Sequence, residues 1–186
     1  TTMKKFGLCD DCGKEYSDPA DRRFHAEPIS CYQCGPVLEL VRLEAGDVKQ
    51  VEKGNRNTLG KVIDLLNDGK IIAIKGIGGF HLVCNAFDHE SVDLLRKRKF
   101  REDKPFALMA KDLETVKQYC KVSPEEEKLL LSYKRPVVLL KRRQATDTTV
   151  PRISGHVAPD NKYLGFMLPY TPLHYMLFSE QVGGSA

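Results

Sequence analysis

Four cysteines near the start of the chain have the spacing of a metal site. Cys9 and Cys12 form one Cys-x-x-Cys pair, Cys31 and Cys34 form a second, and eighteen residues separate the two pairs. Two intervening residues let a short turn direct both thiolates at one ion, and two such turns complete a tetrahedron of sulfur ligands about 2.3 Å from the metal. All four ligands are protein atoms, so no coordination position remains for a substrate. We therefore predict a structural zinc site.

The alternatives for these cysteines are a redox dithiol or a set of disulfides. The chain has six cysteines and no secretory features, which favours metal binding over disulfides. His25 could replace one cysteine, but four thiolates suffice, so we expect it to be a loop residue. Gly13 and Gly35 each follow the second cysteine of a pair, where a tight turn often requires a positive φ. Cys84 and Cys120 lie in apolar patterns and are expected to be small buried hydrophobes.

The second candidate for chemistry is a cluster of cations in RKRKFREDK, residues 96–104. Positive charge held at fixed geometry is the main requirement of phosphoryl and nucleotidyl transfer, so the cluster could clamp a polyphosphate. The alternative is a solvated basic face. Glu102 and Asp103 relieve the charge, which argues against a broad nucleic-acid surface. A second basic stretch, YKRPVVLLKRR, covers residues 133–143.

The third candidate is the glycine-rich segment KGIGG, residues 75–79, which directly follows an expected strand. Backbone N–H groups in such a turn can approach an anionic ligand closely. The glycine spacing matches neither a dinucleotide-binding fingerprint nor a phosphate-binding P-loop. A plain turn is therefore the alternative to a ligand site.

Alternating helices and strands are expected to position these residues. Leu59, Val62 and Leu66 follow helical spacing, in a helix that should end near Gly69. Further strands are expected at residues 70–75 (buried), 80–86, 106–110, 136–140 and 163–168. Helices should start at Asp88, Asp112 and Ser123, the last with a capping box, and a final helix should cover 171–178. This alternation predicts an α/β or α+β sheet domain.

Composition and charge limit the class of protein. The chain has 186 residues, of which 41% are hydrophobic and 29% charged, with a net charge of +4, as in ordinary soluble globular proteins. No apolar run approaches the roughly 18 residues of a membrane span. We expect a cytoplasmic protein that does not enter membranes, and we expect this chain to be a piece of a longer one.

Taken together, the motifs resemble the HypF family, carbamoyltransferases that help make the cyanide ligands of NiFe hydrogenases. The cysteine pairs with the internal DPADRRFHAEP resemble its second zinc motif. The segments KGIGGFHLVCNA, LRKRKFREDKPFALM, RPVVLLKRR and LGFMLPYTPLHYML resemble, in order, its YrdC-like domain. The resemblance implies a zinc-finger-like module with four cysteine ligands over residues 1–50. It also implies a YrdC/Sua5-like nucleotide-binding domain with a twisted mixed sheet over residues 51–186, incomplete at its C-terminus.

The resemblance also implies a reaction. In HypF an acylphosphatase domain removes the phosphate of carbamoyl phosphate. The YrdC-like domain then joins the carbamate to AMP from ATP and releases pyrophosphate, and a further domain passes the carbamoyl group to the C-terminal cysteine of HypE. Only the middle step is expected in this chain. Its substrates would be ATP, with Mg²⁺, and carbamate.

Site residues follow from the same resemblance. Lys99-Phe100-Arg101 is similar to the Lys-x-Arg motif that binds nucleotide phosphates in the YrdC/Sua5 family, whose later Ser-x-Asn motif is expected beyond Ala186. The implied nucleotide-binding residues are Arg98, Lys99, Arg101 and Lys104, with Lys99 and Arg101 catalytic. The implied carbamate-binding residues are Lys75, Gly76, Gly78 and His81. A buried structural role remains the alternative for His81.

Two other functions stay open at this stage. The first is a Sua5-like enzyme that makes threonylcarbamoyl-adenylate for tRNA modification, which the zinc motif and the KGIGG loop disfavour. The second is a zinc-ribbon module that binds nucleic acid through Arg22, Arg23 or the basic stretch. Binding of double-stranded RNA is suggested by fold analogy only.

Overall fold

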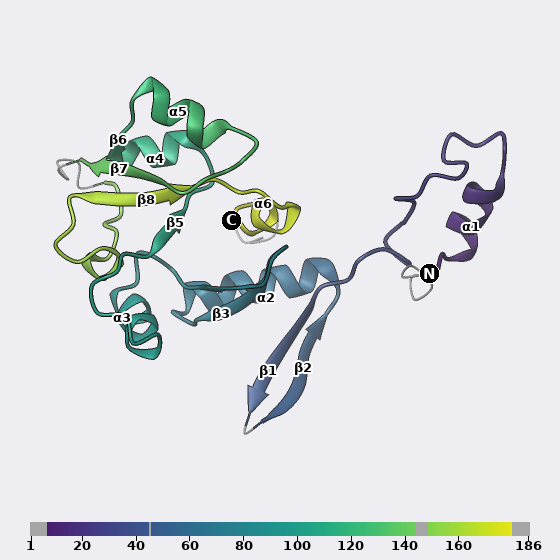
Figure 1. The fold of residues 1–186 in the computed structure, drawn as a ribbon. Coiled ribbons are helices and arrows are strands. Elements are labelled where there is room, and N and C mark those ends of the chain that lie inside the picture. The colour runs from purple at the N-terminus through teal and green to yellow at the C-terminus, as the bar shows by residue number, and fades with distance from the viewer. Residues whose placement is uncertain (1–6, 45, 144–148, 180–186) are drawn as a thin grey trace. The chain divides into compact units, whose positions relative to one another are not determined.

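The computed structural model describes residues 7–44, 46–143 and 149–179 (Figure 1). The chain divides into two compact units, residues 1–58 and 59–186. The division falls within one helix, α2 (Asn55–Asn67), which begins in the first unit and ends in the second. Each unit has its own hydrogen-bonded strands.

The first unit begins with a short helix that the sequence analysis did not predict. Helix α1 (Asp10–Ser17) starts directly after Cys9, so the first cysteine pair lies at its N-terminal end. Asp10 and Asp11 occupy its first turn, where negative charge interacts favourably with the helix dipole. The segment between the cysteine pairs is thus partly helical and not simply a loop.

A β-hairpin follows the cysteine turns and was also not predicted. Strand β1 (Glu39–Glu44) pairs antiparallel with β2 (Asp47–Lys53), and Gly46 in the turn has a φ of 93°. Leu43 lies directly opposite Val48, and their exposed fractions are 74% and 65%. Because neither strand has a buried residue, the hairpin lacks the clean alternation of apolar and polar residues that identifies a strand resting on a core.

The second unit is built on a four-stranded mixed sheet in the order β5-β8-β7-β6, in which β5 is parallel to β8 and the other neighbours are antiparallel. Figure 1 shows α4 and α5 on one side of this sheet. The core side chains Val116, Leu130 and Leu140 are fully buried there. The strands are β5 (Ala107–Met109), β6 (Cys120–Lys121), β7 (Val138–Arg142) and β8 (Tyr163–Met167).

A separate two-stranded hairpin precedes this sheet. Strand β3 (Ile72–Lys75) pairs antiparallel with β4 (Phe80–Val83), and the KGIGG segment makes the turn between them. Both strands were predicted, but the expectation that the first is buried was wrong. Only Ile74 of β3 is buried, because β3 and β4 have no further strand beside them in the described part of the chain.

Polar caps start the helices of the second unit as the sequence predicted. The Asp88 side chain accepts a hydrogen bond from the Glu90 amide, and Asp112 accepts one from the Thr115 amide at 2.8 Å. Ser123 and Glu126 form the predicted capping box. The helices are α3 (His89–Arg98), α4 (Leu113–Tyr119), α5 (Pro124–Leu131), α6 (Pro172–Leu177) and the short 3₁₀ helix η2 (Gly155–Val157).

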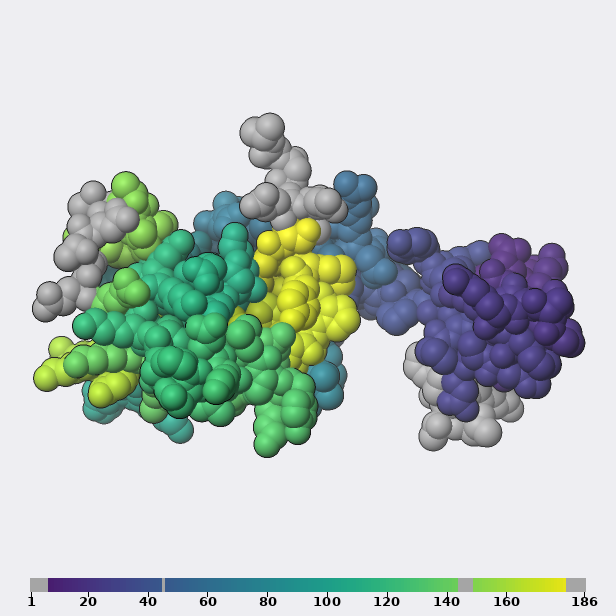
Figure 2. Space-filling view, turned by 90° about the horizontal axis from the view of Figure 1, so that it is seen from above, coloured from purple at the N-terminus to yellow at the C-terminus, as the bar shows by residue number. Residues whose placement is uncertain are grey.

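The predicted α/β class, with a mixed sheet, is confirmed. Helix α6, the yellow element in Figure 2, lies at the surface of the second unit. The polar segment of residues 144–162, between the strands expected at 136–140 and 163–168, reads as a loop in the sequence; its positions 144–148 lie outside the described residues. None of the described helices has the length and apolar character needed to cross a membrane.

Candidate functional site

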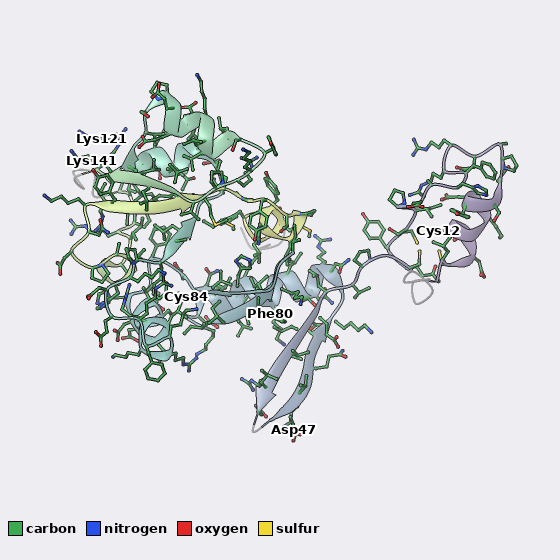
Figure 3. The ribbon with its side chains drawn as sticks, viewed as in Figure 1. Cys12, Asp47, Phe80, Cys84, Lys121 and Lys141 are labelled. Atoms are coloured by element: carbon green, nitrogen blue, oxygen red, sulfur yellow. The ribbon has the colours of Figure 1, made fainter. Side chains whose placement is uncertain are left out.

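The four cysteines of the first unit come together in space. Their Sγ atoms all lie within 4.8 Å of one another (Figure 3). The Sγ atoms of Cys9 and Cys31 are 3.5 Å apart, and those of Cys31 and Cys34 are 3.9 Å apart. A tetrahedral zinc ion with bonds of about 2.3 Å requires sulfurs about 3.8 Å apart, so the donor set fits the metal. All six cysteines are free thiols, which excludes the disulfide alternative for this structure.

Backbone hydrogen bonds shape both cysteine turns. The Gly13 amide donates to the Cys9 carbonyl at 2.8 Å, and the Gly35 amide donates to the Cys31 carbonyl at 2.7 Å. Neither glycine has a positive φ, so that expectation was wrong. Gly35 is required for a steric reason instead, because a Cβ atom at position 35 would lie 2.6 Å from the Cys31 carbonyl oxygen.

Hydrogen bonding favours the metal-binding thiolate form at two of the four cysteines, whereas burial raises the pKa of the Cys12 thiol. Backbone hydrogen bonds at Cys9 and Cys31 lower the pKa of the Cys34 thiol to about 6. Backbone hydrogen bonds at Cys34 and Gln33 lower the pKa of Cys31 in the same way, and the Gln33 amide lies 3.3 Å from the Cys31 sulfur. The finger is therefore suited to a structural zinc ion held by its four cysteines.

The remaining residues of the finger have structural partners. Arg23 forms a 2.6 Å ion pair with Glu15 and also donates to the Ser30 carbonyl, so this arginine is engaged within the unit. His25 stacks with Phe24 and Tyr16, with ring centroids 4.0 and 5.1 Å away. It is an exposed residue of the segment between the cysteine pairs, and the donor atoms that come together are those of the four cysteines.

The glycine turn (residues 75–79) is tighter than the sequence indicated. The Gly76 amide donates to the Gly79 carbonyl at 2.7 Å, so this N–H group is not free for a ligand. Gly78 is exposed, and the Lys75 ammonium lies 4.9 Å from the centroid of the Phe80 ring. Phe80 is marked on the hairpin in Figure 3.

His81 links the glycine turn to the residues before and within α6. Its Nε2 atom is 3.0 Å from the Tyr170 hydroxyl, and its ring centroid is 6.0 Å from that of His174. A Cβ atom on Gly76 would lie 2.7 Å from the same Nε2, so the ring packs directly on the turn. His174 is 4% exposed, and its Nδ1 has no hydrogen-bond partner among the described residues.

The cationic loop (residues 98–104) begins at the end of α3. The Phe100 amide donates to the Lys97 carbonyl and the Arg101 amide to the Arg96 carbonyl, both at 3.1 Å, which is the hydrogen-bond pattern of a Schellman turn. Phe100 takes the left-handed position of that turn, with a φ of 48°, and is 95% exposed. This turn separates Lys99 from Arg101.

The predicted nucleotide-binding residues differ in their surroundings. Arg98, Lys99 and Lys104 are exposed. Arg101 is partly buried: its guanidinium donates to the Pro105 carbonyl at 2.9 Å and lies 4.9 Å from the centroid of the Phe106 ring. Its Nε atom is buried and has no partner among the described residues. Arg101 thus keeps a buried donor unpaired.

Arg96 was predicted only as one cation of the cluster over residues 96–104, and it is buried against backbone carbonyls. Tyr170 and His174, which contact the predicted His81, were not predicted to have a role. Arg96 follows Val92 by four residues and therefore lies on the buried face of α3, a signal that the sequence offered. No short-range pattern pointed to Tyr170, since it contacts a residue 89 positions away.

The second basic stretch is largely used to hold the fold. Arg135 donates to the Leu130 carbonyl, and Arg143 donates to the Cys120 carbonyl. Lys141 on β7 lies opposite Lys121 on β6 (Figure 3). Apart from the cysteines, the predicted site residues form two groups in the second unit. One is the glycine turn with His81, and the other is the cationic loop.

Two family models match the chain. A model of the Sua5, YciO and YrdC proteins, described as "Telomere recombination", matches residues 64–184, and a model described as "HypF finger" matches residues 8–41. The carbamoyltransferase HypF of Rhodobacter capsulatus is 45% identical over 95% of this chain. The chain spans 22% of that relative's length.

Solved structures give the same result. A full-length HypF in a phosphate- and nucleotide-bound form shares 48% identity and a TM-score of 0.74, over 95% of this chain and 22% of that one. The HypF of T. kodakarensis shares 47% identity and a TM-score of 0.78, over 96% of this chain and 22% of that one. This chain belongs to the Sua5/YciO/YrdC family, and over nearly its whole length it is similar to one segment of the HypF carbamoyltransferases, whose finger model also matches it.

Proposed function

We propose that this chain performs the adenylating step of a carbamoyltransferase in NiFe-hydrogenase maturation. In this step it binds ATP and carbamate, forms carbamoyl-adenylate and releases pyrophosphate. The name of the relatives supports a carbamoyltransferase, and the nucleotide-bound form of a HypF 48% identical to this chain supports nucleotide binding. The carbamoyl group would then pass to the C-terminal cysteine of HypE, in the course of cyanide-ligand synthesis.

The observation that carries the proposal is the cationic loop. Lys99 and Lys104 are exposed there, and Arg101 holds a buried Nε donor without a partner among the described residues. A triphosphate carries the negative charge that such a group of donors can neutralise. We assign the phosphates of ATP to Arg98, Lys99, Arg101 and Lys104, with Lys99 and Arg101 acting on the charge that develops between the α- and β-phosphates.

The glycine turn is assigned to carbamate. Lys75 and His81 would hydrogen-bond the carbamate, while Gly76 and Gly78 let the small substrate approach the backbone. The contact between His81 and Tyr170 fixes the orientation of the imidazole, so His81 can present a defined polar edge. The Gly76 amide already donates to the Gly79 carbonyl. The ligand can therefore use only the backbone N–H groups that follow Gly76 in the turn.

The chemical step is a displacement at phosphorus. One carbamate oxygen forms a bond to the α-phosphorus, the bond from that phosphorus to the oxygen bridging the α- and β-phosphates breaks, and its electron pair leaves with pyrophosphate. No protein nucleophile is needed, so positioning and charge neutralisation supply the acceleration. Mg²⁺ bound with ATP would neutralise further phosphate charge.

We place this reaction in the cytoplasm. Free thiolates able to hold zinc persist in a reducing compartment, where disulfides are rare. The finger would then be a structural module that precedes the adenylating domain in the chain, with boundaries near residues 1–50 and 51–186.

The test is carbamate-dependent exchange of labelled pyrophosphate into ATP, measured with the full-length gene product. Ammonium bicarbonate solutions supply carbamate in equilibrium, whereas sodium bicarbonate does not. We expect exchange only with the ammonium salt, and we expect it to be abolished by Lys99→Ala combined with Arg101→Ala. Exchange that is unchanged in the double variant would exclude the phosphate clamp.

The same assay separates the alternatives. A Sua5-like synthase would give exchange with sodium bicarbonate plus threonine, which the match to the HypF finger disfavours. A nucleic-acid-binding module would instead bind RNA, including double-stranded RNA, with a steep dependence on salt. The engagement of Arg23 with Glu15 within the finger argues against that second alternative.

A further inference from the structure

Arg96 places a buried positive charge at the end of α3. Its exposed fraction is 7%, and its guanidinium makes hydrogen bonds only to backbone carbonyls among the described residues. The four shorter bonds measure 2.7 to 3.0 Å and the two longer ones 3.4 Å. The acceptors are the carbonyls of Arg101, Glu102 and Lys104 in the cationic loop and those of His156 and Val157 in η2.

This arrangement joins two parts of the chain that are distant in sequence. Arg96 and His156 are separated by 60 positions, and one guanidinium bonds both the η2 carbonyls and the loop carbonyls. The Phe106 amide, which follows the loop, also donates to the Val157 carbonyl at 2.8 Å. The cationic loop is therefore tied to η2 at both of its ends.

Arg96 also shares an aromatic partner with Arg101. The guanidinium carbons of both arginines lie close to the Phe106 ring, at 4.8 Å for Arg96 and 4.9 Å for Arg101. A cation over an aromatic face is attracted by the ring quadrupole. The Arg101 side chain therefore packs on the same ring as the buried Arg96 guanidinium.

A buried charge without a counter-ion is expensive, so its presence requires a reason. Among the described residues, no carboxylate lies within ion-pair distance of Arg96. Its desolvation is offset by carbonyl dipoles and by the face of the Phe106 ring. An apolar side chain would avoid that cost, but it could not bring three loop carbonyls and two η2 carbonyls to one point.

We infer that Arg96 is a positioning residue that holds the cationic loop in the geometry needed to bind the phosphates of a nucleotide. The inference rests on the proposed function, because the loop is assigned to ATP there. Arg96 itself contacts no substrate. Lysine cannot replace it, since a single ammonium lacks the planar fork of donors that reaches five carbonyls.

The experiment compares two variants that each remove one positive charge from the end of α3. Arg96→Gln removes the carbonyl anchor, whereas Lys97→Gln removes an exposed side chain that forms an ion pair with Asp93. Both variants receive three measurements: ATP affinity by calorimetry, hydrogen exchange of the Arg101 and Phe106 amides by NMR, and global unfolding in urea. Because the charge change is the same, a difference between the variants reports on the anchor.

We expect Arg96→Gln to weaken ATP binding by on the order of 10- to 100-fold, the loss typical of a binding group displaced by about 1 Å. Exchange of the Arg101 and Phe106 amides should accelerate at the same time. Lys97→Gln should resemble the wild type in both respects. In Arg96→Ala, millimolar guanidinium chloride should restore ATP affinity by occupying the vacated carbonyl site, and it should not help the wild type.

Three other results would count against the inference or against the proposed function. The inference would be overturned if Arg96→Gln and Lys97→Gln had the same ATP affinity and the same amide exchange. It would also be overturned if Arg96→Lys bound ATP as tightly as the wild type. If both Arg96→Gln and Arg96→Lys were globally unfolded, Arg96 would be a residue needed for folding, and the inference would again be overturned. All these variants are made in the full-length gene product; a full-length wild type that binds no ATP would refute the proposed function instead, and the exchange data would still test the positioning of the loop.

Discussion

Among single residues, His174 shows how burial sets a protonation state. It is 4% exposed, and burial together with the neighbouring His81 lowers its pKa below the ordinary value of 6.5. A neutral imidazole is thus favoured at this position. The Tyr170 ring lies near both histidine rings, with its centroid 4.5 Å from that of His174.

This lowered pKa predicts a dependence of stability on pH. Above pH 7 the imidazole is neutral in both the folded and the unfolded chain. As the pH falls through 6.5, the unfolded chain gains a proton that the folded chain does not accept, so the free energy of unfolding decreases. Urea unfolding between about pH 7.5 and 5.5 should show this decrease, and His174→Gln should flatten it. An unchanged slope in the variant would contradict the assignment.

The residues found by sequence and those missed differ in how far their partners lie along the chain. The zinc ligands were predictable because each pair is spaced three apart and the chemistry of thiolates is specific. Arg96 appeared only as one cation among several, because its partners in η2 follow it by 60 and 61 positions. Phe100 gave no signal either, since left-handed positions at helix ends usually carry glycine.

Among the elements, α5 is the helix whose start is determined most clearly by residues close to one another in the sequence. Its capping box joins Ser123 and Glu126, with Pro124 at the first helical position and acidic residues in the first turn. These signals lie within a few residues of one another, so the sequence predicted the start of the helix correctly. The hairpin of β1 and β2 was missed for the opposite reason: it has no buried face among the described residues to mark its register.

The capping box predicts a measurable contribution to stability. Ser123→Ala should reduce the free energy of unfolding of the second unit by about 1 kcal/mol, because the Glu126 amide loses its acceptor at a helix end. Ser132→Ala is the matched control at the other end of α5, where an exposed hydroxyl donates to the Leu129 carbonyl. Urea unfolding followed by circular dichroism measures both. A control loss as large as the Ser123 loss would exclude a special role for the box.

Across the whole molecule, the two units are stabilised in different ways. The second unit has a core of fully buried side chains, including Val116, Leu130 and Leu140. In the described residues of the first unit before α2, only Cys12 and Ile29 are buried. Two buried side chains cannot offset the entropy of ordering such a segment, so a metal ion must supply the stabilisation there.

Zinc removal should therefore unfold one unit and spare the other. A structural zinc ion contributes on the order of 10 kcal/mol, so a chelator should abolish the dispersed NMR signals of residues 8–36. Signals of residues 107–140 should remain. Cys31→Ser should lose the metal in elemental analysis, whereas Cys84→Ser, a change outside the cluster, should retain one zinc per chain. Intact finger signals in the chelated protein would contradict a metal-dependent fold.

The contact between Gly76 and the His81 ring has a consequence for how such sequences can change over time. A single methyl group at position 76 would lie 2.7 Å from Nε2 and 2.8 Å from Cδ2 of the imidazole. Position 76 can therefore accept a larger residue only after a smaller side chain has replaced the imidazole at position 81, whereas position 81 can change first without a clash. The contact thus sets the order in which these two positions can change in evolution.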